Sequence, residues 1–133
     1  VNLWLALAFD AHVHHSSALG WFESSSETSY FCRLTQQGFL RLATNPKVLN
    51  EDAVSLKEAW LMYDQILADP LVAYAEEPAD IEDKWRAYTQ RESFTPNVWS
   101  DAYLAAFAQA AGFELVTLDH DFKRYQQTRF RIL

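Results

Sequence analysis

Residues 97–122 read NVWSDAYLAAFAQAAGFELVTLDHDF, and this stretch decides the fold. Asn97 is a residue type that favours the N-cap of a helix, and Asp101 falls in the first turn, where the helix dipole favours a negative charge. Gly112 is a typical residue to end that helix. Small side chains recur at helical spacing between these points, which predicts a smooth helix face that can lie close to a sheet. The members of this face are Ala102, Ala105, Ala106, Gln109 and Ala110.

The segment after Gly112 completes half of an α/β unit. Residues 114–118 are mostly apolar and predict a short buried strand, and Asp119 stands where that strand stops. Ligand sites in such folds lie beyond the carboxyl ends of the strands. Asp119 is therefore placed for chemistry, and Asp101 can approach it from the start of the helix. Both acids also have local interpretations, as a dipole residue and a turn former, and Asp121 suits the N-cap of a short turn over residues 122–125.

Three segments stand in an order and spacing that point to a known family. They are VNLWLAL at residues 1–7, LTQQGFLRL at residues 34–42, and the closing pair WSDAYLA at 99–105 and TLDHDF at 117–122. Together they resemble the motifs of PIN-domain ribonucleases, and in particular those of the VapC toxins of bacterial toxin–antitoxin pairs. The resemblance extends over nearly the whole chain.

The resemblance implies a fold as well as a family. It implies an α/β protein, a three-layer α/β/α arrangement around a short, mainly parallel central sheet. It also implies a single PIN-like domain over residues 1–133. In this family a first strand and a first catalytic Asp would stand immediately before Val1, where the given sequence starts.

The implied activity is Mg²⁺- or Mn²⁺-dependent endoribonuclease cleavage. Clustered carboxylates hold a divalent ion, which neutralises the phosphate and lowers the pKa of a bound water. Asp101 and Asp119 correspond to catalytic metal ligands, and Asp121 to a further acid of the metal site. Gln36 stands where the family often carries an acid, so it supplies an amide oxygen without charge. The supporting residues are Asn2, Gln36 and Thr117.

The partners implied by the resemblance are an RNA substrate, a cognate antitoxin whose tail blocks the acidic pocket, and a second copy of the toxin in a homodimer. The net charge of −7 at first argues against nucleic acid. However, a metal-dependent hydrolase must concentrate carboxylates, and four basic residues follow Asp119 and predict a basic rim or, alternatively, a solvated surface. They are Lys123, Arg124, Arg129 and Arg131.

Composition limits the class of protein. Half of the 133 residues are hydrophobic and only three are Gly, which favours one folded domain over disorder. The single Cys32 excludes an internal disulfide framework and suits a small buried side chain. No segment has the length of a membrane span or the pattern of a signal peptide, so we expect a cytoplasmic protein without a membrane partner.

The remaining elements follow from periodicity and punctuation. Helices are expected over residues 2–9, 15–23, 35–44, 55–68 and 81–91, and further strands over 29–32, 72–74 and 129–133. Thr35 is expected to cap the third of these helices, and residues 45–52 are expected to form a loop. Residues 93–96 are expected to lead into the helix that follows Asn97. His12, His14 and His15 fit a loop better than a zinc site. Trp4, Trp21 and Trp60 exceed what one small core needs, so some are expected on a partner surface.

Two functions from other classes stay open at this point. A catalytically degenerate PIN fold would only bind a partner or RNA, and Gln36 in place of an acid favours it. A phosphatase-like phosphoryl-transfer enzyme would use Asp119 and Asp121 as an Asp-x-Asp pair, although such enzymes carry the pair after their first strand.

Overall fold

The chain forms two compact units in a computed structural model, which describes residues 1–92 and 95–133. The first unit spans Val1–Glu76 and the second Glu77–Leu133. The expected approach over residues 93–96 lies partly outside the described residues. The expectation of one domain over residues 1–133 stays a prediction.

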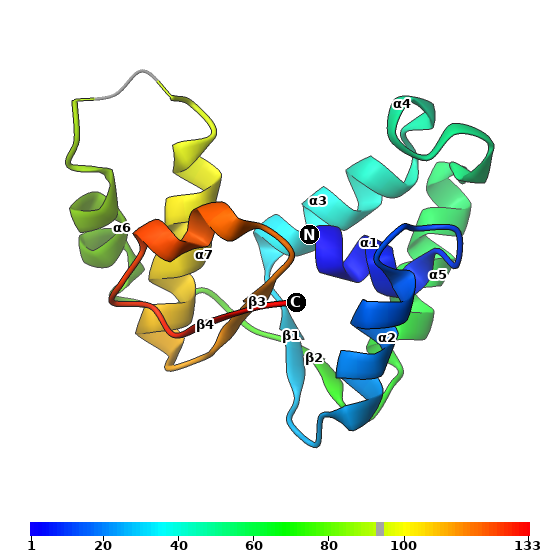
Figure 1. Ribbon diagram of the computed structural model, residues 1–133, viewed down its shortest axis with the longest axis horizontal. Helices are drawn as coiled ribbons and strands as arrows, with labels where there is room; N and C mark the ends of the chain where they lie inside the picture. Colours follow the sequence, from blue (N-terminus) through cyan, green and yellow to red (C-terminus); the bar gives the residue numbers. More distant parts are fainter. Residues whose placement is uncertain (93–94) are drawn as a thin grey trace. The chain divides into compact units, whose positions relative to one another are not determined.

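The first unit contains most of the helices (Figure 1). Its elements are α1 (Asn2–Ala8), α2 (His15–Ser24), β1 (Ser29–Phe31), α3 (Arg33–Ala43), α4 (Pro46–Leu49), the 3-10 helix η1 (Asn50–Asp52), α5 (Leu56–Leu67) and β2 (Val72–Tyr74). The second unit contains α6 (Ile81–Thr89), α7 (Val98–Ala111), β3 (Leu115–Thr117), the 3-10 helix η2 (His120–Arg124) and β4 (Phe130–Ile132). Among the described residues no helix combines the length and the apolar character that a membrane span requires.

Each unit holds one pair of parallel strands. β1 pairs with β2 so that Ser29 faces Val72, and β3 pairs with β4 so that Leu115 faces Phe130. Parallel neighbours require a crossover, which α3 to α5 supply in the first unit and η2 supplies in the second. The predicted α/β class with short parallel strands is confirmed. In the described part of the chain the strands form two two-stranded sheets.

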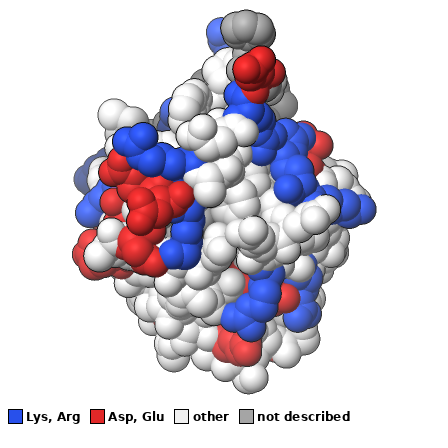
Figure 2. Space-filling view, turned by 90° about the vertical axis from the view of Figure 1, so that its left-hand side faces the viewer, with Lys and Arg blue, Asp and Glu red and all other residues white. Residues whose placement is uncertain are grey.

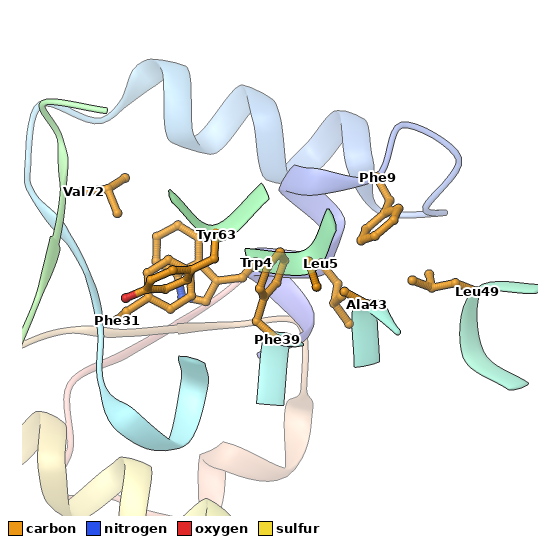
Figure 3. Packing of buried hydrophobic residues seen from close by; sticks show 10 residues of the cluster. Trp4, Leu5, Phe9, Phe31, Phe39, Ala43, Leu49, Tyr63 and Val72 are labelled. Carbon is orange, nitrogen blue, oxygen red and sulfur yellow. The ribbon is translucent and has the colours of Figure 1, made fainter. Parts of the chain in front are cut away.

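Aromatic rings build the core of the first unit around Phe31, which is fully buried (Figure 3). Trp4 stacks on Phe31 with ring centroids 4.0 Å apart. Phe39 and Tyr63 meet the same ring edge-on, with centroids at 6.2 and 5.0 Å. Trp4 therefore belongs to the core and not to a partner surface, whereas Trp60 is 50% exposed.

Two local predictions in the first unit are wrong. Helix α3 begins at Arg33 and its N-cap is Cys32, because the Thr35 hydroxyl takes the N3 position of a capping box and accepts a hydrogen bond from the Cys32 N–H at 2.9 Å. Residues 45–52 are not a loop. The Asn45 side chain accepts a hydrogen bond from the Lys47 N–H, and Pro46 occupies the first turn, so a short helix forms there.

The second unit is built on α7, whose small side chains are buried as predicted. Ala102, Ala105 and Ala106 are fully inaccessible. The helix contacts β3, but it packs most extensively on α6, where the Trp85 ring meets Tyr103 edge-on at 5.4 Å. A second core cluster forms on this helix from Val98, Ala102, Ala105, Phe122 and Tyr125.

Both ends of α7 lie where they were predicted. Gly112 follows the helix with φ at 71°, the left-handed conformation that glycine adopts without a steric penalty. Asn97 is the N-cap of the helix, as predicted, although its side chain makes no capping hydrogen bond. Asp101 lies in the first turn, as predicted.

Candidate active site

Asp119 is fixed by backbone hydrogen bonds at the end of β3. The Asp119 N–H donates to the Thr117 hydroxyl at 3.0 Å, and the Asp119 Oδ1 accepts from the Asp121 N–H at 2.8 Å. Asp119 is thus the N-cap of η2, and the prediction that Asp121 caps this turn is wrong. One carboxylate oxygen of Asp119 accepts a backbone hydrogen bond in this turn, so the backbone sets the orientation of the carboxylate.

Asp101 is partly buried, and two further acids act on it. Burial raises the pKa of its carboxyl first, and the negative charge of Asp119 raises it further. Asp121 acts in the same direction, while Arg124 opposes the rise in pKa. The second unit therefore holds three carboxylates within electrostatic reach of one another. We call Asp101, Asp119 and Asp121 the acidic cluster.

The basic residues after Asp119 are largely engaged inside the second unit. Arg124 forms an ion pair with Asp121 at 3.1 Å, and Arg131 pairs with Glu114 at 3.3 Å. Arg129 donates a hydrogen bond to the Gly112 carbonyl. The face shown in Figure 2 carries acidic and basic side chains in adjoining patches. The predicted basic rim is thus made of residues whose charges are partly balanced within the fold.

The two remaining supporting residues of the prediction lie in the first unit. Asn2 is the first residue of α1 and is exposed. Gln36 is 8% exposed in α3, and its amide oxygen accepts a hydrogen bond from Arg33. It also moderates the rise that burial causes in the pKa of Tyr63. Gln36 has a clear structural role in this unit.

The donor chemistry of the acidic cluster suits a hard divalent cation. Mg²⁺ is usually bound by one or two carboxylates together with waters and substrate phosphates. No three His, Cys, Asp or Glu side chains within residues 1–92 and 95–133 form a group that could enclose a metal ion by themselves. An ion at Asp101 and Asp119 would therefore keep part of its coordination for water or phosphate.

The histidines do not form a metal site in the described chain. His15 Nδ1 donates to the Ala6 carbonyl at 2.8 Å, and its Nε2 lies 3.5 Å from Asp10. The His15 ring thus links the end of α1 to the start of α2, and the prediction of a loop entering a helix is confirmed.

Tyr125 is a residue beside the cluster that sequence reasoning did not single out. It is 1% exposed, and burial followed by the charge of Asp101 raises its pKa. In the sequence it reads only as the end of a turn. Its sequence signal is an aromatic residue four positions after Asp121.

Comparison with known proteins agrees with this geometry. The sequence matches the PIN domain family over residues 1–127. It is 44% identical to Ribonuclease VapC41 of Mycobacterium tuberculosis, over 99% of this chain and 94% of that protein. It is 31% identical to Ribonuclease VapC38 of the same species, over 90% of this chain and 82% of that protein.

A solved structure gives the same fold. VapBC2 from Rickettsia felis, bound to a DNA fragment from its promoter, superposes with a TM-score of 0.69 over 98% of this chain and 93% of that chain, at 13% identity. The family match also leaves the phosphatase interpretation of Asp119 and Asp121 without support. The chain belongs to the PIN domain family and, within it, to the VapC group.

Proposed function

We propose that this protein is a Mg²⁺- or Mn²⁺-dependent endoribonuclease and the toxin of a toxin–antitoxin pair. The observation that carries the proposal is the partly buried carboxylate of Asp101 beside the charges of Asp119 and Asp121. Like charges held together in a partly desolvated place destabilise a fold unless a cation joins them. Relatives that carry the name ribonuclease over almost the full chain support the same activity.

Each residue has a defined part in the proposed reaction. Asp101 and Asp119 bind the divalent cation, and Asp121 adds negative charge beside them. The cation supplies charge neutralisation at the phosphodiester and a bound water of lowered pKa. Thr117 holds the Asp119 backbone, which keeps the carboxylate in place before the cation arrives. Gln36 supports the fold of the first unit by binding Arg33. The supporting role that the family resemblance implies for Asn2 stays a prediction.

The proposed partners follow from the relatives. Their names indicate ribonuclease activity, and the superposed structure is a VapBC pair. We therefore propose an RNA substrate, an antitoxin that covers the acidic cluster, and a toxin homodimer that acts in the cytoplasm. Co-purification from the native operon tests the antitoxin: a small partner should accompany the protein, and RNA cleavage should fall when it is bound.

The activity is tested by two isosteric substitutions and one matched control. Asp101→Asn and Asp119→Asn should each abolish divalent-dependent RNA cleavage while the far-UV circular dichroism spectrum is kept. Asp83→Asn makes the same change at an exposed acid of α6 in the same unit and should cleave like the wild type. Undiminished cleavage by Asp101→Asn would reject the assignment.

A non-catalytic binding module is the second candidate. It is favoured by Gln36 in place of an acid and by the incomplete metal group among the described residues. Calorimetric titration of the protein with Mn²⁺ separates the two candidates. A module without catalysis should show no binding up to millimolar Mn²⁺, whereas the proposed ribonuclease should bind the ion and lose that binding in Asp101→Asn.

A further inference from the structure

The hydroxyl of Tyr125 is a buried polar group without a hydrogen-bond partner among the described residues. The residue is 1% exposed, and its ring is held on two sides. Tyr88 meets it edge-on with centroids 5.2 Å apart, and Phe122 lies at 5.7 Å. The ring is thus fixed by packing, and the hydroxyl cannot turn out to solvent.

Tyr125 packs on the side of α7 that carries Asp101. The α7 residues of its core cluster are Val98, Ala102 and Ala105. Val98 and Ala105 stand three residues before and four residues after Asp101, and positions at these spacings share one helix face. The charge of Asp101 also acts on the Tyr125 hydroxyl and raises its pKa, so the two groups are within electrostatic reach.

Other buried hydroxyls of the second unit are paired. The Thr128 hydroxyl donates to the Ala105 carbonyl at 2.9 Å, and the Tyr88 hydroxyl lies 2.9 Å from both Gln109 and Thr128. A buried hydroxyl without a partner costs free energy, and phenylalanine would fill the same place without that cost. The difference singles out Tyr125, because its hydroxyl is unpaired among the described residues and within electrostatic reach of Asp101 and Asp121.

We infer that the Tyr125 hydroxyl is a positioning group of the metal site, which accepts a hydrogen bond from a water of the divalent cation that Asp101 and Asp119 would hold. The inference rests on the proposed function. The hydroxyl oxygen receives no hydrogen bond from the described residues, so it is open as an acceptor. Mg²⁺ and Mn²⁺ retain waters when few carboxylates bind them, and those waters, whose oxygen is bound to the cation, donate hydrogen bonds to fixed neighbours.

Tyr125→Phe tests this inference, with Tyr88→Phe as the matched control in the same ring cluster. The readouts are Mn²⁺ affinity by calorimetry and the melting temperature of the metal-free protein, both on the full chain. Tyr125→Phe should lower Mn²⁺ affinity about 10–100-fold, as loss of an outer hydrogen bond does elsewhere, while the metal-free melting temperature stays or rises. Tyr88→Phe should lower the melting temperature and leave Mn²⁺ affinity within about twofold.

The outcomes separate the inference from the proposed function. Mn²⁺ binding that Asp101→Asn abolishes and Tyr125→Phe retains within about twofold overturns the inference alone. A loss of affinity in Tyr125→Phe that comes with a lowered metal-free melting temperature also overturns it, because the hydroxyl would then be structural. Wild-type protein that binds no Mn²⁺ at millimolar concentration overturns both proposals.

Discussion

The two units differ in how completely their inward-facing polar groups are paired. In the first unit the amide oxygen of the buried Gln36 is taken up by Arg33. In the second unit burial, followed by the charge of Asp119, raises the pKa of the Asp101 carboxyl, and the Tyr125 hydroxyl has no partner among the described residues. Polar groups that serve stability are normally paired within the fold. The unpaired groups of the second unit are therefore the ones to test for ligand binding.

The hydrophobic cores of the two units also differ in the size of their side chains. Large rings close around Phe31 in the first unit, whereas in the second unit the rings of Phe122 and Tyr125 pack together with small side chains of α7. Ring packing buries much apolar area, which is the main source of folding free energy. We therefore expect the first unit to be sensitive to core truncation and the second to changes of charge.

The largest expected effect is the truncation of the first core. Phe31→Ala should lower the free energy of unfolding by about 3–5 kcal/mol, because the stacked and edge-on rings around it lose their common partner. Urea denaturation followed by tryptophan fluorescence measures the change. Val13→Ala, at a residue that is 86% exposed, is the control and should leave the midpoint unchanged. A loss below about 1 kcal/mol for Phe31→Ala would contradict the ring-centred core.

Gln36→Ala should have a smaller effect that is confined to stability. It removes the acceptor of Arg33 and should lower the free energy of unfolding by about 1–2 kcal/mol, with Mn²⁺ affinity unchanged. Gln37→Ala, at the exposed neighbour, should change neither quantity. A drop in Mn²⁺ affinity for Gln36→Ala alone would place this amide at the metal and break the comparison between the units.

The pH dependence of metal binding sharpens the same comparison. The pKa of Asp101 is raised in the fold, so below that pKa a cation must displace a proton. Mn²⁺ affinity should fall as the pH falls through the raised pKa, by up to about tenfold per pH unit for one displaced proton. Titration calorimetry from pH 7 down to about pH 4, the ordinary pKa of an Asp carboxyl, tests this expectation. Equal affinity across that range would argue against Asp101 as a ligand.

The smallest expected effect concerns the metal-free protein. A raised pKa means that the ionised Asp101 opposes folding above that pKa, and that this penalty is relieved as the pH falls through it. Asp101→Asn should therefore raise the metal-free melting temperature slightly at neutral pH, whereas Asp83→Asn should not. The helix dipole works the other way, since a negative charge in the first turn stabilises α7 by about 0.3–1 kcal/mol. A lowered melting temperature would show that the dipole outweighs the repulsion.

Sequence reasoning succeeded where a local pattern decides the outcome. The course of α7, its end at Gly112 and the strand before Asp119 follow from periodicity and from residue types with narrow conformational preferences. The family resemblance rests on the same residues, which is why it identified the PIN domain.

Prediction from the sequence failed where tertiary contacts or competing capping residues decide the local structure. Cys32 is an unusual N-cap, and Thr35 reads as the stronger choice until the capping box is seen. A proline just after the helix expected over residues 35–44 reads as the start of a loop, but Pro46 begins a short helix of its own. The role inferred for Tyr125 could not be read from the chain, because it depends on which face of α7 its ring meets.

The two carboxylate oxygens of Asp119 differ in what they can bind. Oδ1 accepts a hydrogen bond from the Asp121 N–H and so stabilises the start of η2. Oδ2 is then left to bind a ligand. An asparagine at this position retains a carbonyl oxygen for the N–H and surrenders only the charge. If the Asp119→Asn variant is inactive, the cause would therefore be the lost charge and not a misfolded C-terminal segment. Substitution of Asp119 is for this reason easier to interpret than substitution of Asp101.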